Sequence, residues 1–324
     1  MSGPLVPATR RSAPRAGPEA QDIGFEFGAM ACVCEVRLSG LDEARAAPLA
    51  QQAIAEVRRI EAAYSRYRAD SILSRINAAA GTGEAIAVDA ETGHLLNFAA
   101  QLHGASDGLF DVTSGVLRKA WDFKAARLRA PGQIESLLPL VGWQQVQWRD
   151  GRIALPRAGM ELDFGGIGKE YAADRAATLL QRLGARSAML NLGGDIQLVG
   201  PRPNGAPWAL GIAHPRQNGA LLATMRLPDG ALATSGDYER FFEIDGQRFC
   251  HVLNPHTGWP VASWQSVSVM APACLAAGAL TTIAMLKGEA ALAFLDQQQV
   301  DYLAVDALGR VHRGGPQTVE RAQR

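Results

Sequence analysis

The sequence predicts a single α+β domain over residues 23–315. The chain has 324 residues and 48% of them are hydrophobic, so it can bury a large core and is not globally disordered. Segments in which apolar and polar residues alternate, as in strands, are interspersed with segments that have the 3.6-residue period of helices. Because no linker-like stretch interrupts them between Phe25 and Gly314, we expect one compact domain.

In its first half the domain is predicted to contain a strand, three helices and a hairpin. The sequence CVCEVRL alternates like a strand, Ser71 is a suitable helix N-cap, and Asp150-Gly151 is a typical hairpin turn. In chain order these elements are a strand over Phe25–Leu38, helices over Leu41–Tyr67, Ser71–Asn77 and Asp89–Ala105, and a hairpin over Val146–Leu155.

In its second half the domain is predicted to alternate between helices and strands. Gly258–Leu286 is long and uncharged enough to suggest a membrane span, but Pro260 and Pro272 interrupt it and WQSVSVM alternates, so a strand followed by a helix is the better interpretation. The elements are helices over Tyr171–Leu183, Cys274–Leu286 and Glu289–Gln297; strands over Ala188–Leu192, Trp208–Ala213, Ala220–Leu227, Ala231–Thr234 and Trp264–Met270; and hairpins over Phe241–Val252 and Tyr302–His312.

The two ends of the chain have the composition of tails. Residues 1–22 are rich in Pro, Ala, Arg and Gly and lack hydrophobic periodicity, so we expect a disordered N-terminal tail; residues 316–324 form a polar C-terminal tail. No apolar segment typical of a signal peptide follows Arg10-Arg11, and the expected location is cytoplasmic. The four cysteines have no zinc-finger or thioredoxin spacing, which favours free thiols. A formal net charge of +0 argues against a nucleic-acid partner.

The stretch Glu161–Asp195 is the most informative part of the chain. We expect a strand, a glycine turn, a helix, a second strand and a second glycine turn. Asp163 precedes a Gly-Gly-x-Gly turn that opens the helix carrying Lys169, where backbone amides favour an anion. The turn is either a tight structural connection or part of a site for a nucleotide phosphate, a metal ion or both.

Three further segments are candidates for chemistry. Phe110 and Asp111 follow a glycine and could stack on an aromatic ring and bind its edge, although such loops are common. Ser235–Glu239 and His251–Gly258 flank one hairpin and should lie close together. The adjacent Thr281-Thr282 lie within an apolar helix, where Thr usually bonds to the preceding turn.

Taken together, these segments resemble the ApbE family of flavin transferases. Seven segments in one order carry the resemblance: AMACVCE, SRYRADSILSRIN, DGLFDVTSG, LDFGGIGKEYAADRA, LNLGGD, ATSGDYERFF and HVLNPHTGWP. The resemblance implies a T-fold-like arrangement of mixed or antiparallel sheets packed with helices. It also implies FAD and a divalent cation, usually Mg²⁺, and transfer of FMN from FAD to a Thr or Ser hydroxyl of a target flavoprotein of a redox complex, with release of AMP.

The resemblance also assigns roles to residues. Its implied cofactor contacts are Met30 and Tyr67 on the flavin, Asn77 at the end of the same segment, Leu109, Phe110 and Asp111 on the adenosine side, Asp163, Lys169, and the turn at His251 and Val252. The implied metal site consists of the Gly166 carbonyl with Thr281 and Thr282. For the base that deprotonates the acceptor hydroxyl, His251 is the first candidate and Asp237 a weaker one.

The sequence departs from the family pattern at two positions. Gly278 stands where the family motif A-D-A-x-x-T has its Asp, and Glu170 follows Lys169 where many relatives have Gly. Loss of a carboxylate should weaken Mg²⁺ binding. Either another carboxylate such as Asp195 or Asp163 replaces it, or the FAD pyrophosphate supplies the charge, or the metal site is lost. The alternatives to transfer are therefore an FAD-binding module without catalysis and an FAD pyrophosphatase.

Overall fold

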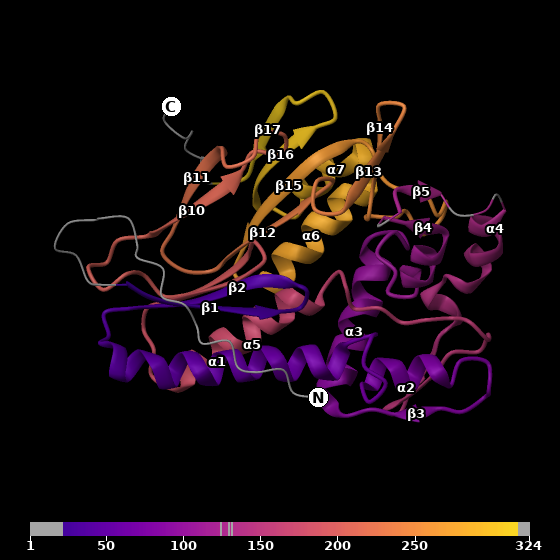
Figure 1. Cartoon of the computed structure of the whole chain (residues 1–324), viewed down its shortest axis with the longest axis horizontal. Coiled ribbons are helices and arrows are strands. Elements are labelled where there is room, and N and C mark those ends of the chain that lie inside the picture. Colours follow the sequence, from indigo (N-terminus) through magenta and orange to yellow (C-terminus); the bar gives the residue numbers. More distant parts are fainter. Residues whose placement is uncertain (1–21, 124, 129, 131, 317–324) are drawn as a thin grey trace.

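The computed structural model describes residues 22–316 except 124, 129 and 131. Its centre is an eight-stranded sheet in the order β1-β2-β8-β9-β12-β15-β16-β17, in which every neighbouring pair is antiparallel (Figure 1). The strands are β1 (Asp22–Ala29), β2 (Cys32–Ser39), β8 (Ala188–Leu192), β9 (Asp195–Val199), β12 (Ala231–Gly236), β15 (Trp264–Ala271), β16 (Asp301–Asp306) and β17 (Val311–Gly314). The expected α+β class is confirmed.

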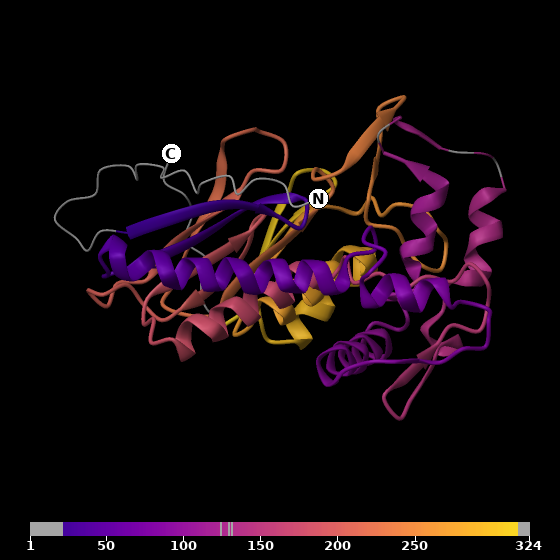
Figure 2. The ribbon, with the colours of Figure 1, turned by 60° about the horizontal axis from the view of Figure 1, so that its bottom comes forward.

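Three helices cover one face of this sheet. They are α1 (Glu43–Tyr64), α5 (Gly168–Arg182) and α6 (Cys274–Lys287), with the short α7 (Ala291–Gln297) after α6. The Asp42 side chain caps α1, and a stripe of small and branched residues on that helix, including Ala53 and Val57, is fully buried. Figure 2 shows α1 running beneath β1 and β2, with α5 beside it. The face that these helices bury forms the main core.

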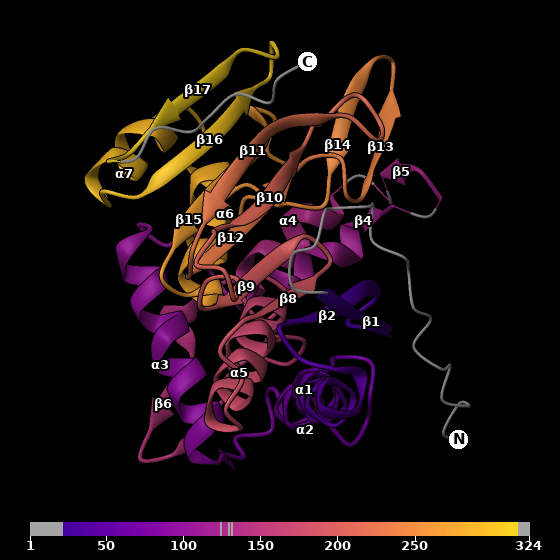
Figure 3. The same ribbon diagram turned by 90° about the vertical axis from the view of Figure 1, so that its left-hand side faces the viewer.

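A hairpin of β10 (Trp208–Ala213) and β11 (Leu221–Leu227) covers the opposite face (Figure 3). Its inward residues form a second core with the outer face of the sheet: Met189, Ile196, Leu198, Trp208, Leu210, Ile212, Ala223, Met225, Leu232, Met270, Leu303 and Val305. The middle strands of the sheet are therefore buried on both faces, which fixes their register.

The remaining elements form a lobe beside one end of the sheet. It contains α2 (Ile72–Ala78), α3 (Ala90–Ala105), α4 (Gln133–Leu137), a small sheet of β3 (Ile86–Ala87), β7 (Arg152–Ala154) and β6 (Gln147–Arg149), the pair β4 (Trp121–Asp122) and β5 (Arg127–Leu128), and the 3-10 turns η1 (Ser114–Ala120), η2 (Leu138–Leu140) and η3 (Trp143–Gln145). The hairpin of β13 (Phe241–Ile244) and β14 (Gln247–Cys250) packs on it through Trp121, Phe242 and Phe249.

Most predicted elements are confirmed, but two predictions about strands were wrong and one strand of the central sheet was not predicted. The expected strand Phe25–Leu38 is a hairpin that turns at Met30 and Ala31, which both have positive φ and carry none of the usual Gly or Asn signal. No strand precedes Asp163, because the backbone of Leu162 bonds to the Asn77 side chain rather than to a neighbouring strand. The strand β9, beginning at Asp195, was missed.

The apolar stretch around α6 belongs to the core. Cys274–Gln297 is long and apolar enough to cross a membrane, with a mean hydropathy of 1.3, but 56% of its most apolar window is buried. Because α6 packs against β12 and β15, the predicted strand followed by a helix is confirmed here.

Candidate functional site

A buried charged cluster lies where α5 begins, against the start of β9. The ammonium of Lys169 forms an ion pair with Asp195 Oδ2 and lies 3.9 Å from Glu170 Oε1. Both carboxylate residues are buried, with 3% and 6% of their surface exposed. Burial lowers the pKa of Lys169, but the charges of Glu170 and Asp195 outweigh it and the net shift is upward. Lys169 is therefore an ammonium, suited to a phosphate oxygen.

Hydroxyl groups from β12 and α6 lie against this cluster. Asp195 Oδ1 accepts a 3.3 Å hydrogen bond from the backbone N–H of Thr234. The next residue, Ser235, has its Oγ 2.8 Å from Thr281 Oγ1 and 3.4 Å from Thr282 Oγ1. Both threonines predicted for the metal site thus meet Ser235, which the sequence placed in a candidate segment without a role. Thr281 also donates to the Gly278 carbonyl at 2.9 Å, the back-bonding expected of Thr inside a helix.

Glu170 occupies the space beside Gly278. A Cβ added to Gly278 would lie 2.5 Å from Glu170 Cγ and 2.9 Å from its Oε1. Glu170 Oε2 is buried and has no hydrogen-bond partner. Burial, and then the Asp195 carboxylate, raise the pKa of Glu170 to about 7, although Lys169 opposes the shift. A buried carboxylate oxygen without a partner is costly unless a ligand or cation completes the site.

The oxygen atoms of this region fit a hard divalent cation. The Glu170 carboxyl group lies against Gly278 on α6 and Asp195 bonds to Thr234 on β12, the two elements that carry the hydroxyls of Thr282 and Ser235, and Mg²⁺ prefers oxygen ligands of these kinds. Among the described residues no group of three His, Cys, Asp or Glu converges on one point. A cation here would therefore complete its coordination with hydroxyl, carbonyl, water or phosphate oxygens.

Asp163 is held by Arg66, a residue that the sequence analysis missed. Arg66 Nη1 forms an ion pair with Asp163 Oδ2, while Nη2 donates a 2.7 Å hydrogen bond to the Tyr67 hydroxyl. Asp163 Oδ1 accepts from the Gly165 N–H at 2.9 Å, which shapes the glycine turn. The Arg66 guanidinium also lies over the Tyr67 ring, with Cζ 4.9 Å from the ring centroid, and the residue is 80% exposed, so the other face of the ring is open to a planar ligand. The signal for Arg66 was its place next to Tyr67.

Asn77 and Met30 both form hydrogen bonds with segments distant in the chain. The Asn77 amide donates to the Leu162 carbonyl at 3.0 Å and accepts from the Leu162 N–H at 2.7 Å, so it fixes the segment that carries Asp163. Met30 lies in the β1–β2 turn, and its N–H donates to Glu61 Oε1 at 2.5 Å. In this structure Asn77 is a positioning residue, and a flavin contact for Met30 stays a prediction.

The loop at Leu109–Asp111 lies beside the glycine turn. The Phe110 ring is 5% exposed, and a Cβ on Gly166 would be 3.3 Å from it, so two predicted site segments meet here. Asp111 is buried, and its carboxylate accepts hydrogen bonds from the Thr113 N–H and hydroxyl and from the Trp143 N–H. These bonds use its oxygens to hold the loop, while Leu109 is half-buried.

The two candidate bases differ in their surroundings. Asp237 accepts from both Nη atoms of Arg216, at 2.7 and 2.6 Å, and Arg248 lies 3.4 Å away, so its carboxylate is committed to ion pairs. The exposed His251 follows β14, and its N–H donates to the Arg240 carbonyl. Desolvation by surrounding protein atoms and the charge of Arg240 lower the pKa of His251 to about 4, so its imidazole is neutral at pH 7. Catalytic roles for both stay predictions, with His251 favoured.

Comparison with known proteins identifies the family to which this chain belongs. The model of the ApbE family matches residues 30–304. The chain belongs to the ApbE family. It is 30% identical over 243 residues to the FAD:protein FMN transferase of Haemophilus influenzae, covering 71% of this chain and 70% of that one, and 32% identical over 248 residues to that of Vibrio cholerae, covering 74% of each.

Solved ApbE structures share the fold. The ApbE protein of Thermotoga maritima has a TM-score of 0.83 and 29% identity, covering 90% of this chain and 97% of that one. The flavin transferase ApbE of Vibrio cholerae has a TM-score of 0.81 and 25% identity, covering 91% and 97%. The expected ApbE-like fold is thereby confirmed.

Two cysteines adjoin the charged cluster of this ApbE-family chain. Cys32 Sγ and Cys34 Sγ are 3.6 Å apart on β2. The hydrogen bond from Cys34, and more weakly the charge of Lys169, lower the pKa of Cys32 to about 7 against the effect of burial. All four cysteines are free, as expected.

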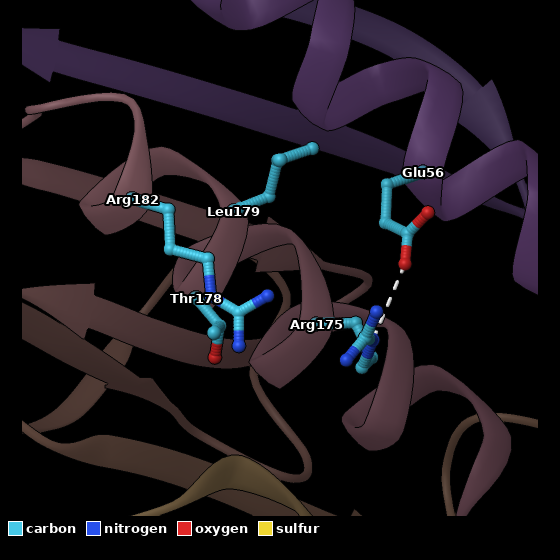
Figure 4. Close-up of a pocket in the computed structure, with 5 residues that line it drawn as sticks. All are labelled: Glu56, Arg175, Thr178, Leu179 and Arg182. Atoms are coloured by element: carbon cyan, nitrogen blue, oxygen red, sulfur yellow. Dashed lines mark hydrogen bonds and ion pairs between the residues drawn. The ribbon is translucent and has the colours of Figure 1, made fainter. Parts of the chain in front are cut away.

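A small surface pocket lies elsewhere, between α1 and α5. Figure 4 shows its lining, in which Arg175 bonds to Glu56 at 3.2 Å; the other residues are Thr178, Leu179 and Arg182. None of these is a predicted site residue of the ApbE pattern. The Glu56 carboxylate of the pocket already forms an ion pair with Arg175, and we assign the pocket no role.

Proposed function

We propose that this chain is an FAD:protein FMN transferase that moves FMN from FAD onto a Thr or Ser hydroxyl of a target flavoprotein. The relatives with this name support the proposal, since they match across more than two thirds of their own length. The observation that carries it is the buried cluster of Lys169, Asp195 and Glu170 at the start of α5. Such a cluster suits a pyrophosphate with a cation.

The reaction replaces the phosphoanhydride bond of FAD by a phosphoester bond to the acceptor hydroxyl. The acceptor oxygen forms a bond to the FMN phosphorus, the bond between that phosphorus and the bridging oxygen of the pyrophosphate breaks, and AMP leaves with that oxygen. Lys169 would hold phosphate oxygens, and the neutral His251 would accept the proton of the hydroxyl. Because phosphoryl transfer is largely positioning and charge neutralisation, these two residues and a cation suffice in kind.

We propose Mg²⁺ as the cation. Thr282 and Asp195 would help to hold it, together with the Gly166 carbonyl that the family resemblance implies. When bound, the ion neutralises negative charge on the phosphates and orients them. An acidic, oxygen-lined region with one partnerless carboxylate oxygen supports this choice over a thiolate-binding metal.

The partner in this proposal is a flavin-carrying subunit of a redox complex. A cytoplasmic location, a target accessible from that side, and the absence of a nucleic-acid partner or a membrane span all remain proposals from the sequence. The balanced charge supports the absence of a nucleic-acid partner, and the burial of α6 supports the absence of a membrane span.

The test is to incubate the purified protein with FAD, MgCl₂ and a purified flavin-carrying subunit. We expect a fluorescent flavin band on the target in a denaturing gel and an equal amount of AMP. His251→Ala should abolish the band while FAD binding persists; His94→Ala, at an exposed position on α3, is the matched control.

Each alternative has its own result. Free FMN formed without a target would indicate an FAD pyrophosphatase. Bound FAD with neither product across several metals would indicate a binding module and refute the proposal.

A further inference from the structure

We propose that Glu170 is the principal carboxylate ligand of the divalent cation, supplied from α5 in the space that Gly278 leaves open on α6. The proposal rests on the proposed function for the identity of the substrate that the cation serves. Glu170 thereby has a binding role, whereas in the sequence it stood out only as a departure from the family pattern.

The Glu170 side chain occupies the space beside Gly278. Gly278 and Thr282 are four residues apart on α6, so they lie on the same face of that helix. The Glu170 carboxyl group fills the position above Gly278, with Cδ and Oε1 each 2.9 Å from where a Cβ would stand. A carboxylate from residue 170 thus reaches the place from which a side chain at residue 278 would approach the neighbourhood of Thr282.

The state of the Glu170 carboxylate also supports the proposal. Only 6% of the surface of Glu170 is exposed, and its Oε2 atom has no hydrogen-bond partner among the described residues. A carboxylate with two oxygens can accept about four hydrogen bonds, and burying it without them is unfavourable. A cation bound at Oε2 removes this cost, whereas no described side chain does.

The charge of the cluster supports the proposal as well. Glu170 and Asp195 provide two carboxylates, but Lys169 provides the one ammonium that contacts them. The amides at the start of α5 add only partial positive charge. A divalent cation outweighs the excess negative charge of this cluster, and the positive charge that remains can attract the incoming pyrophosphate.

The other two nearby carboxylates, Asp163 and Asp195, are already bound to protein groups and cannot replace the missing Asp at position 278 as the main ligand. Asp163 is bound to Arg66 and to the Gly165 N–H, so neither of its oxygens is free. Asp195 bonds to Lys169 and to the Thr234 N–H, so it can assist only in part. Of these three carboxylates, Glu170 is the one with an oxygen that has no such commitment.

The test measures cation binding directly. Mn²⁺ is titrated into the protein, alone and saturated with FAD, with the free ion followed by electron paramagnetic resonance; Mg²⁺ competition gives its own affinity. Glu170→Gln keeps the shape and removes the charge, and we expect about 10- to 100-fold weaker binding, at least the loss seen for outer-shell partners. Glu91→Gln is the matched control, because Arg59 and Tyr171 already bind that carboxylate.

A double variant makes the test positional. Glu170→Gly with Gly278→Asp returns the carboxylate to α6 and should restore Mn²⁺ binding to within a few-fold of the original. Unchanged binding in Glu170→Gln, absence of binding in the original protein with and without FAD, or a folded double variant as weak as Glu170→Gln would each overturn the proposal.

The outcome is separable from the proposed function. If Mn²⁺ binding depends on Glu170 but no flavin reaches any target, the function fails and this inference stands. If flavin transfer occurs while Glu170→Gln binds Mn²⁺ normally, the function stands and this inference fails.

Discussion

Replacing Gly278 with Ala should change stability in opposite directions depending on residue 170. In a helix interior Ala is favoured over Gly by about 0.5–1 kcal/mol. Here the added Cβ would lie 2.5 Å from Glu170 Cγ, and overpacking of this kind costs about 1–3 kcal/mol. We therefore expect Gly278→Ala to lower the free energy of unfolding by up to about 2 kcal/mol in the original chain.

With Glu170→Ala already present, the obstacle is gone and the same change should raise the free energy of unfolding by about 0.5–1 kcal/mol. Urea unfolding of the four proteins, with EDTA and without FAD, gives the coupling energy, which we expect to be about 1–3 kcal/mol. Gly104→Ala on α3 is the control, because a Cβ there meets no atom within 4 Å. Equal effects of Gly278→Ala in both backgrounds would refute the packing argument.

Three more predictions concern groups around the site. Cys32 should be alkylated first among the cysteines, with a rate that rises through about pH 7 because its pKa is lowered; mass spectrometry after iodoacetamide pulses checks this, and a rise only above pH 8.5 would contradict it. Arg66→Met should lower the free energy of unfolding by about 1–3 kcal/mol, since the Asp163 carboxylate loses its partner; urea unfolding measures it, and a neutral effect would show that the pair contributes nothing. The acid limb of kcat/KM for flavin transfer should lie below pH 6.5, because a lowered pKa keeps His251 unprotonated to lower pH; a limb at or above 6.5 would exclude His251 as the base.

Hydrophobic periodicity predicted most of the long helices well, because the buried face of a helix is set by a pattern within one short stretch of sequence. The buried stripe of α1 and the cap at Ser71 are visible in the sequence, and the structure has them. The order of strands in the sheet was not predictable, because β2 pairs with β8 across a long stretch of chain. Such pairing depends on packing between distant segments.

The site was predicted in its segments but not in its contacts. Lys169 and Thr282 were singled out as candidates in the sequence before the family resemblance gave them roles, and the structure places their segments around one cluster. The roles of Asn77 and Asp111 in holding loops could not be predicted, since their partners are backbone groups of distant residues. Any residue type can supply a backbone partner, so the sequence contains no complementary side chain that would reveal such a bond.

The two departures from the family pattern, Glu170 and Gly278, concern the same space between α5 and α6. With both Glu170 and an Asp at 278, a third carboxylate would be forced into the space that Glu170 fills, against a single ammonium. With Gly at both positions, Asp195 would remain as the cluster's carboxylate, already bound to Lys169. Only an exchange of the two residue types keeps both the packing of α5 on α6 and the number of carboxylates. A Gly at an expected ligand position therefore does not by itself indicate a lost metal site, because the side chain that fills its space decides the chemistry.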